Sequence, residues 1–207
     1  MNIGFDFDGT LLDSRFRHVL TLRLVWPDVD ATLRAGWAER LMESKLNGES
    51  TKTFLRGEGS VNADEISRNW IRHIEDDDML ASDRPYEGAL DSLRKLNELK
   101  HDIYLVTARR SAIAAQSQVK SHGMEEYIKF VGVVSPGLAA GEEKAALLAS
   151  LPIDVVVGDT ESDQEWADCM GARFIAVDWG FRSNDYWLRK NVKAVSTYGE
   201  LYNELGG

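Results

Sequence analysis

Cysteine and histidine are scarce in this sequence, and long apolar runs are absent. Cys169 is the single cysteine among 207 residues, so no disulfide bond can form within the chain and a reducing compartment is expected. The four histidines are scattered and lack the spacing of zinc ligands. No apolar run approaches the roughly 20 residues that span a bilayer, and the first residues lack the basic and apolar regions of a signal peptide. These absences predict a soluble, cytoplasmic protein that is not inserted in a membrane.

Positive charge is also in short supply. The chain has 24 Lys and Arg against 34 Asp and Glu, which gives a net charge of −10. A field of that sign repels a polyanion, so nucleic acid is not an expected partner. Hydrophobic residues make up 43% and charged residues 28%, which is typical of a globular protein and not of a disordered or fibrous one. At this length we expect one domain, or one core with a sizeable insert.

Apolar runs of strand length alternate with amphipathic helical patterns over most of the chain. This alternation is typical of parallel β-α-β units, and it predicts an α/β protein with one doubly wound, five-stranded parallel sheet. The expected strands are residues 3–7, 103–106, 130–134, 153–157 and 174–177. The expected helices between them are residues 86–100, 111–122, 142–150 and 162–170.

The alternation is interrupted between Asp13 and Asp83, where helical periodicity continues for about seventy residues without a convincing strand. Such a connection is far longer than a β-α-β crossover requires. We therefore predict two domains, an α/β core of residues 1–13 and 84–207 and a helical cap of residues 14–83 inserted after the first strand. The helices expected in the cap are residues 17–25, 32–46 and 63–74.

Two carboxylates stand at the end of the first expected strand. Asp6 and Asp8 alternate with apolar residues, so both carboxylates share one face of the strand. Buried carboxylates need a partner, a hydrogen-bond donor or a metal ion. Gly9 follows at once and permits a turn, which favours a position at the carboxyl end of the strand. The pair is therefore predicted to lie in a site and not in the core.

Two further strands also end in polar residues. Thr107 follows the second expected strand, and Gly158 and Asp159 follow the fourth. Ligands bind at the carboxyl edge of open parallel sheets, so these groups and the first pair are expected to converge on one crevice. Asp163, on the first turn of the next helix, is placed to point back toward it. Several carboxylates in one crevice favour proton sharing or a hard cation with oxygen ligands, which Mg²⁺ fits better than zinc.

Four segments carry a resemblance to a known family. The sequence Asp-Phe-Asp-Gly-Thr-Leu-Leu-Asp-Ser at residues 6–14 resembles the first signature of the haloacid dehalogenase superfamily, in the branch of small phosphatases related to phosphoglycolate phosphatase and β-phosphoglucomutase. Thr107, in Leu-Val-Thr-Ala-Arg, resembles the second motif. Lys144, in Gly-Glu-Glu-Lys-Ala-Ala-Leu-Leu, resembles the third, with Lys129 as a rival. The Gly-Asp-x-x-x-Asp pattern at residues 158–163 resembles the fourth, and the insert stands where the family has its helical cap.

The resemblance implies a Rossmann-like core and a Mg²⁺-dependent phosphatase that hydrolyses a small phosphate monoester through an aspartyl-phosphate. It implies Asp6 as the nucleophile and Asp8 as the acid that protonates the leaving alcohol and then activates water. Repulsion from an ionised Asp6 is expected to keep Asp8 protonated. The other implied roles are Mg²⁺ on Asp6, Asp159 and the main-chain carbonyl of Asp8, phosphoryl oxygens on Thr107 and Lys144, and Asp163 in the outer shell or toward Lys144.

Asp8 and the cap also bear on the type of reaction. Dehalogenases of the superfamily lack an acid at the position of Asp8, because a halide leaves without a proton, so Asp8 favours phosphoryl transfer. Related phosphonate hydrolases use a cap lysine close after the first motif, whereas the first lysine in this insert is Lys45. Two alternatives stay open, a phosphosugar mutase of the same fold and a non-catalytic binding or regulatory protein that has kept the fold.

The residues that select the substrate are harder to read from the sequence. Arg15, His18 and Arg56 are candidate substrate contacts because they are cationic or polar and belong to the insert that would close over the site. Surface charge is at least as good an interpretation of each. Arg109 and Arg110 are candidates for a second anionic group of the substrate, or for a solvated helix start. The expected partner is a small phosphorylated metabolite, and the expected oligomeric state is a monomer or a homodimer.

Overall fold

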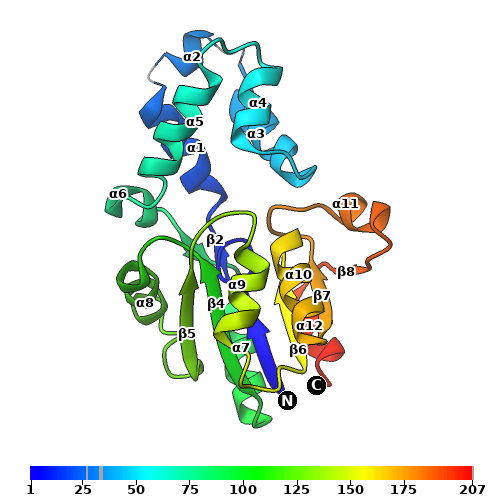
Figure 1. Ribbon diagram of the computed structural model, residues 1–207. Coiled ribbons are helices and arrows are strands. Elements are labelled where there is room, and N and C mark those ends of the chain that lie inside the picture. Colours follow the sequence, from blue (N-terminus) through cyan, green and yellow to red (C-terminus); the bar gives the residue numbers. More distant parts are fainter. Residues whose placement is uncertain (27, 33–34, 207) are drawn as a thin grey trace.

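The computed structural model describes residues 1–26, 28–32 and 35–206 and has a six-stranded sheet at its centre (Figure 1). The strand order is β5-β4-β1-β6-β7-β8, and neighbouring strands are parallel. The strands are β1 (Asn2–Phe5), β4 (Asp102–Ala108), β5 (Phe130–Val134), β6 (Val155–Gly158), β7 (Arg173–Val177) and β8 (Ala194–Val195). The predicted α/β fold with a parallel sheet is confirmed, with one strand more than expected. Two residues are too few to show an alternation in the sequence, so β8 lies outside the expected set.

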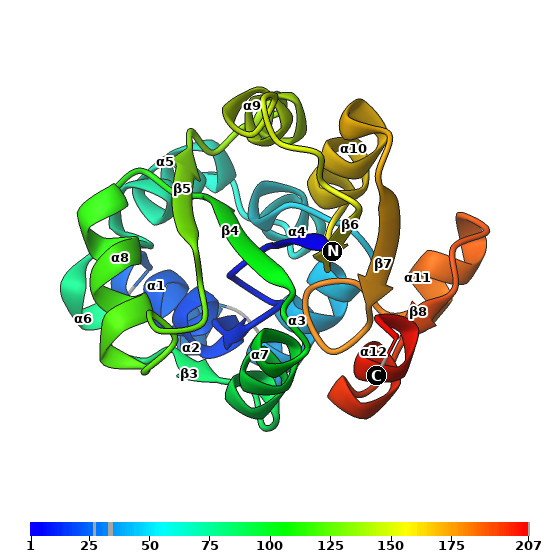
Figure 2. The same cartoon turned by 90° about the horizontal axis from the view of Figure 1, so that it is seen from below.

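Successive residues of each strand point to opposite faces of the sheet, and two apolar layers result. Leu105 and Val157 belong to one buried cluster, whereas their neighbours Val106 and Val156 belong to another. Figure 2 shows α9 and α10 on one side of the sheet and α7 and α12 on the other. This is the doubly wound arrangement that the alternation predicts. The helices of the core are α7 (Ala89–Glu98), α8 (Ala112–Ser121), α9 (Ala140–Leu147), α10 (Glu161–Met170), α11 (Asn184–Arg189) and α12 (Tyr198–Glu204).

A helical region follows the first strand, and we call its residues 14–83 the cap. Its apolar cluster includes Leu22, Leu41 and Leu55. The chain enters and leaves the cap through an antiparallel pair of short strands, β2 (Leu12–Asp13) and β3 (Arg84–Pro85). The pairing supports the boundaries of the cap, which stay a prediction. The cap helices are α1 (Arg15–Val25), α2 (Val29–Thr32), α3 (Trp37–Leu46), α4 (Thr51–Gly57), α5 (Ala63–His73) and α6 (Asp77–Leu80).

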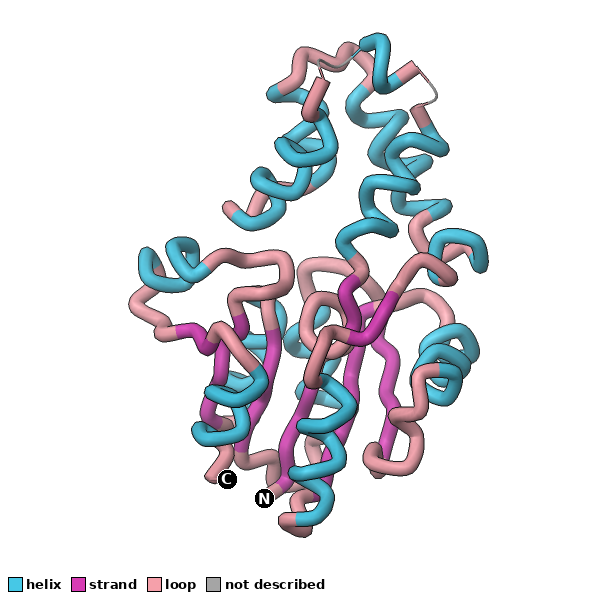
Figure 3. The backbone as a smooth tube through the Cα atoms, turned by 180° about the vertical axis from the view of Figure 1, so that it is seen from behind, coloured by secondary structure: helices cyan, strands magenta, loops and turns pink. Residues whose placement is uncertain are grey.

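Three of the cap helices correspond to the expected ones. The expected helix over residues 32–46 is shorter in the structure: α3 begins at Trp37, and residues 33–34 lie outside the described part of the chain. The helix α4 is an addition, and its start is fixed by Ser50, whose hydroxyl accepts a hydrogen bond from the N–H of Thr53 at 3.0 Å. Figure 3 shows the cap beyond the edge of the sheet at which the strands end, away from both chain termini. Within the described residues, no helix combines the length and the apolarity needed to cross a membrane.

Gly4 allows the ring of Trp166 on α10 to lie directly against β1. A Cβ atom at residue 4 would lie 2.6 Å from Cη2 of Trp166, whose side chain is fully buried. We expect Gly4→Ala to lower the free energy of unfolding by about 1–3 kcal/mol, because the ring has little space into which to move. Gly57→Ala, where nothing lies within 4 Å of the added Cβ, is the control and should be neutral or slightly stabilising. Urea unfolding measures both, and equal results for the two variants would contradict this packing argument.

Candidate active site

The acidic ends of β1 and β6 meet at one edge of the sheet. The two strands are parallel neighbours, and the N–H of Asp6 donates to the carbonyl of Val157 at 3.0 Å. Asp6, Asp159 and Asp163 each place one carboxylate oxygen within 4.8 Å of the others, and all three residues are buried. The structure thus brings together three carboxylates from the first and fourth motifs.

Asp159 is held by hydrogen bonds from two loops. Its Oδ2 accepts a hydrogen bond from the N–H of Phe181 at 2.6 Å, and its Oδ1 accepts one from the hydroxyl of Thr10 at 3.3 Å. Gly9, with φ of +86°, comes so close that a Cβ atom there would lie 2.3 Å from Oδ2 of Asp159. Glycine adopts this backbone conformation without strain, and its lack of a side chain lets the loop after β1 wrap around the carboxylate.

Lys144 joins two of these carboxylates. Its Nζ lies 2.6 Å from Oδ1 of Asp6 and 2.6 Å from Oδ1 of Asp163. Burial opposes the charge on Lys144, but the adjacent carboxylates outweigh it and raise the pKa of the ammonium group above its usual range. The rival Lys129 is exposed and pairs with Asp102 at 2.7 Å. Of the two candidate lysines, the structure places Lys144 at the carboxylates.

The carboxylate cluster has the donor chemistry of a divalent cation site. Burial and the adjacent Asp163 raise the pKa of Asp6 to about 7. Burial, Asp6 and Asp163 likewise raise the pKa of Asp159 well above its usual range. Three buried carboxylates with one lysine carry excess negative charge, and all available ligand atoms are oxygens. A hard ion such as Mg²⁺ would relieve the repulsion and match these donors, so the residues present fit the expected metal.

Asp8 has a different environment from Asp6. Nε and Nη2 of Arg109 donate to its two carboxylate oxygens at 2.6 Å each, and Nη2 of Arg17 donates to Oδ1 at 2.5 Å. Burial raises the pKa of Asp8, but the two arginines outweigh it and hold the pKa well below the usual range. The expectation that Asp8 is the protonated member of the pair is therefore wrong for this arrangement. Two arginines, and not the Asp6 carboxylate, dominate its surroundings.

A buried polar network supports the two arginines. Asp83 lies 3.4 Å from Nε of Arg17 and 3.6 Å from Nη2 of Arg109. Gln118 donates to Asp83 at 3.0 Å and accepts a hydrogen bond from Nη1 of Arg109. Burial raises the pKa of Asp83 to about 6 against the opposing effect of Arg17. The network ties the first cap helix to the loop after β4, and no sequence motif indicates it.

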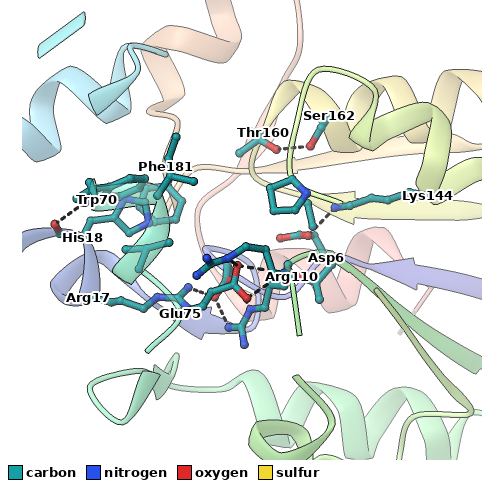
Figure 4. Close-up of a pocket in the computed structure, with 17 residues that line it drawn as sticks. Asp6, Arg17, His18, Trp70, Glu75, Arg110, Lys144, Thr160, Ser162 and Phe181 are labelled. Atoms are coloured by element: carbon teal, nitrogen blue, oxygen red, sulfur yellow. Dashed lines mark hydrogen bonds and ion pairs between the residues drawn. The ribbon is translucent and has the colours of Figure 1, made fainter. Parts of the chain in front are cut away.

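A cavity of about 270 Å³ lies between the carboxyl edge of the sheet and the cap. Asp6, Thr107 and Lys144 line it from the core, and His18 and Trp70 line it from the cap. Figure 4 shows Lys144 beside Asp6, and the rings of His18 and Trp70 grouped away from them. The cavity therefore joins the predicted reacting groups to a cap surface. Its other lining residues are Asp8, Arg17, Ile71, Ile74, Glu75, Ala108, Arg109, Arg110, Pro136, Thr160, Ser162 and Phe181.

Arg15 and Arg56, two of the expected substrate contacts, are not among the residues that line the cavity. Arg15 pairs with Asp13 at 2.6 Å, and Arg56 pairs with Asp64 at 3.0 Å. We therefore correct the assignment of these two residues. The physical reason on α1 is helix phase, because residues two apart lie on different faces and Arg17 points to the cavity in place of Arg15.

The sequence matches a known protein family over most of its length. A model of the haloacid dehalogenase-like hydrolases matches residues 3–168, a range that holds the cap and all the predicted reacting groups. The chain belongs to this family. The resemblance seen in residues 6–14 is thereby confirmed. No curated protein matches the sequence.

Solved structures share the fold of this haloacid dehalogenase-like hydrolase. A family member from Streptococcus pneumoniae is 18% identical with a TM-score of 0.73, covering 99% of this chain and 97% of its own. A predicted phosphatase from Clostridium acetobutylicum is 18% identical with a TM-score of 0.71, with the same coverage. A predicted phosphoglycolate phosphatase from Haemophilus somnus 129pt is 15% identical with a TM-score of 0.72, again covering 99% and 97%. At these identities the likeness shows the fold.

Substitution of Lys144 and of Lys129 in this hydrolase tests which of the two lysines acts in the active site. We expect Lys144→Met to lower the rate of phosphate release by at least about a hundredfold. The variant should also lose about 3 kcal/mol of stability near pH 7.5, because Asp6 and Asp163 stay buried without their cation. Lys129→Met is the matched control and should change neither quantity. The rate of phosphate release and urea unfolding are measured for both variants. A larger loss of rate in Lys129→Met than in Lys144→Met would reverse the assignment.

Proposed function

We propose that this hydrolase is a Mg²⁺-dependent phosphatase that cleaves a small phosphate monoester through an aspartyl-phosphate on Asp6. The observation that carries the proposal is the arrangement around Asp6. Its carboxylate is hydrogen-bonded to Lys144 and lies within 4.8 Å of Asp159 and Asp163, at one end of a cavity that also holds Thr107. Two of the similar structures are of predicted phosphatases, which agrees with this reaction.

In the first step an oxygen of Asp6 bonds to phosphorus, and the bond between phosphorus and the leaving oxygen breaks. Thr107 and Lys144 hold the phosphoryl oxygens. Mg²⁺ held by Asp6, Asp159 and the carbonyl of Asp8 would offset the charge on those oxygens. The leaving oxygen takes its proton from Asp8. Arg109 and Arg17 keep the pKa of Asp8 low in the arrangement described, so Asp8 must first lose at least one arginine contact and take up a proton from solvent.

In the second step a water molecule attacks phosphorus and gives a proton to Asp8. The bond between phosphorus and Asp6 breaks, and inorganic phosphate leaves. The water must be activated by a base, and Asp8, which is ionised once it has given its proton to the leaving oxygen, is proposed to act as that base. We place the reaction in the cytoplasm, since a single cysteine agrees with a reducing compartment.

A panel of phosphate monoesters assayed for inorganic phosphate tests the proposal. The expected result is phosphate release with Mg²⁺ from several esters and none with EDTA. Exchange of phosphate between positions of a sugar without release would instead identify a phosphosugar mutase. Absence of both activities over the panel would favour a non-catalytic protein of the same fold.

A further inference from the structure

Each cation that lines the cavity is paired with carboxylates of the protein. Lys144 is bound to Asp6 and Asp163, and Arg17 and Arg109 share Asp8 and Asp83, as described above. Arg110 pairs with Glu75, which lies in the turn after α5. The main-chain N–H of Arg110 donates to Glu75 at 2.9 Å, and Nε lies 3.5 Å from the same carboxylate, whose side chain is 7% exposed. Among the residues that the structure describes, each Lys or Arg that lines the cavity therefore has a carboxylate partner.

The cations that line the cavity serve the reacting phosphate or bind carboxylates of the protein. The phosphate is to be held by Lys144, Thr107 and a divalent ion at the cluster, whereas the lining arginines already pair with Asp8 or Glu75. A second anionic group on the substrate would therefore enter without a free cation to meet it, and the desolvation of that group would go uncompensated. The carboxylates that pair with the lining cations are Asp6, Asp8, Glu75, Asp83 and Asp163.

Apart from Arg17 and Glu75, the residues that line the cavity on the cap side are apolar or uncharged. Trp70, Ile71, Ile74 and Phe181 contribute hydrocarbon and aromatic surface. The ring of His18 lies 4.5 Å from that of Phe181 and 5.0 Å from that of Trp70, between centroids. Burial, with Lys45 and Arg17 nearby, holds the pKa of His18 well below its usual range, so its imidazole is neutral. Nδ1 of His18 is buried without a hydrogen-bond partner.

We propose that the leaving alcohol is uncharged and presents an apolar or aromatic face to this wall, and that the Glu75–Arg110 pair selects against esters with a second anionic group. This inference rests on the proposed phosphatase function and narrows its substrate class. Phosphoglycolate, which carries a carboxylate beside its phosphate, is predicted to be a poor substrate in spite of the likeness of fold.

Lys45 is a cation beside this wall for which the described residues show no ion pair with a carboxylate. Its Nζ lies 5.0 Å from the centroid of the Trp70 ring, and its side chain is not part of the cavity lining. Burial and the adjacent Arg182 lower the pKa of Lys45 to about 7, which leaves it partly neutral at that pH. Because its Nζ lies over the Trp70 ring and its side chain does not line the cavity, Lys45 does not offer the contact that a second anionic group there would need.

Two isosteric esters test the inference. The 4-carbamoylbenzyl and 4-carboxybenzyl phosphates have nearly the same size and leaving alcohol, and they differ in one charge. The kcat/KM of the wild-type protein with Mg²⁺ should be about tenfold or more higher for the carbamoyl ester. In Glu75→Gln, which leaves Arg110 without its carboxylate, the ratio of the two kcat/KM values should fall toward one. Glu65→Gln, an exposed change on α5, should keep the wild-type ratio.

The outcomes distinguish the inference about the substrate from the proposed phosphatase function. A wild-type ratio near one, or a preference for the carboxylate ester, would overturn the inference while phosphatase function stands. The same holds if other esters of the panel are cleaved and both probes are refused, because a neutral aromatic leaving group is predicted to be accepted. If Glu75→Gln keeps the wild-type ratio, the Glu75–Arg110 pair does not select against a second anionic group. Failure of every ester to release phosphate would overturn the proposed function itself, and the inference with it.

Discussion

Asp6→Asn is expected to lower the rate of phosphate release by at least about a thousandfold, because a neutral amide is too weak a nucleophile to form the phosphoryl bond. The substitution keeps the shape of the side chain and removes a buried charge. Since burial and Asp163 raise the pKa of Asp6 to about 7, loss of that charge should leave the metal-free protein at least as stable as the wild type near pH 7.5. Rates and urea unfolding therefore separate a chemical defect from a folding defect.

The covalent role of Asp6 has a direct readout. Acid quenching of the wild-type protein during turnover of a ³²P-labelled ester should leave label on the protein, and Asp6→Asn should retain none. Asp168→Asn is the matched control, because Asp168 is exposed on α10 and takes part in no interaction described here. A near-normal rate for Asp6→Asn would contradict the covalent route, and a large loss for Asp168→Asn would show that the assay reports something other than the nucleophile.

The parts of the site that follow strand ends could be predicted from the sequence. Asp6 and Asp159 come directly after an apolar strand and Thr107 lies near the end of one, and parallel pairing of adjacent strands is enough to bring them to one edge. Lys144 could be placed only by its motif, because a lysine on a helix gives no local signal that it is buried. These predictions depend on the order of strands along the chain and not on the detailed path of the cap.

The surroundings of Asp8 could not be predicted, because they are assembled from distant segments. Arg17 comes from α1, Arg109 from the loop after β4, and Asp83 from the end of the cap. Sequence alternation places Asp8 beside Asp6 but says nothing of which arginine reaches it. Two arginines reverse the order of the two pKa values that repulsion between Asp6 and Asp8 alone would give. The contact of a cap residue with Asp8 also links the ionisation of Asp8 to the position of the cap.

Mg²⁺ should raise the thermal stability of the protein and should be required for turnover. At a concentration a hundred times its dissociation constant, a ligand of the folded state contributes about 2.7 kcal/mol. For a protein of this size that corresponds to a rise in Tm of about 5–10 °C. Asp159→Asn should abolish the rise, because it removes a carboxylate of the buried cluster, without lowering the Tm of the metal-free protein. Asp168→Asn should keep the full rise, and a rise that survives Asp159→Asn would place the ion elsewhere.

The rise in Tm should also depend on pH in a defined direction. The pKa of Asp6 is raised from 3.8 to about 7 by burial first and by Asp163 second. A carboxyl group with a raised pKa keeps its proton in the folded chain where the unfolded chain has lost it, so its contribution to stability is complete below about pH 4 and is lost as the pH rises through 7. Mg²⁺ competes with these protons, so the rise in Tm at a fixed Mg²⁺ concentration should be larger near pH 8 than near pH 6. Equal shifts at the two pH values, measured by differential scanning calorimetry, would contradict a metal bound to the Asp6 carboxylate.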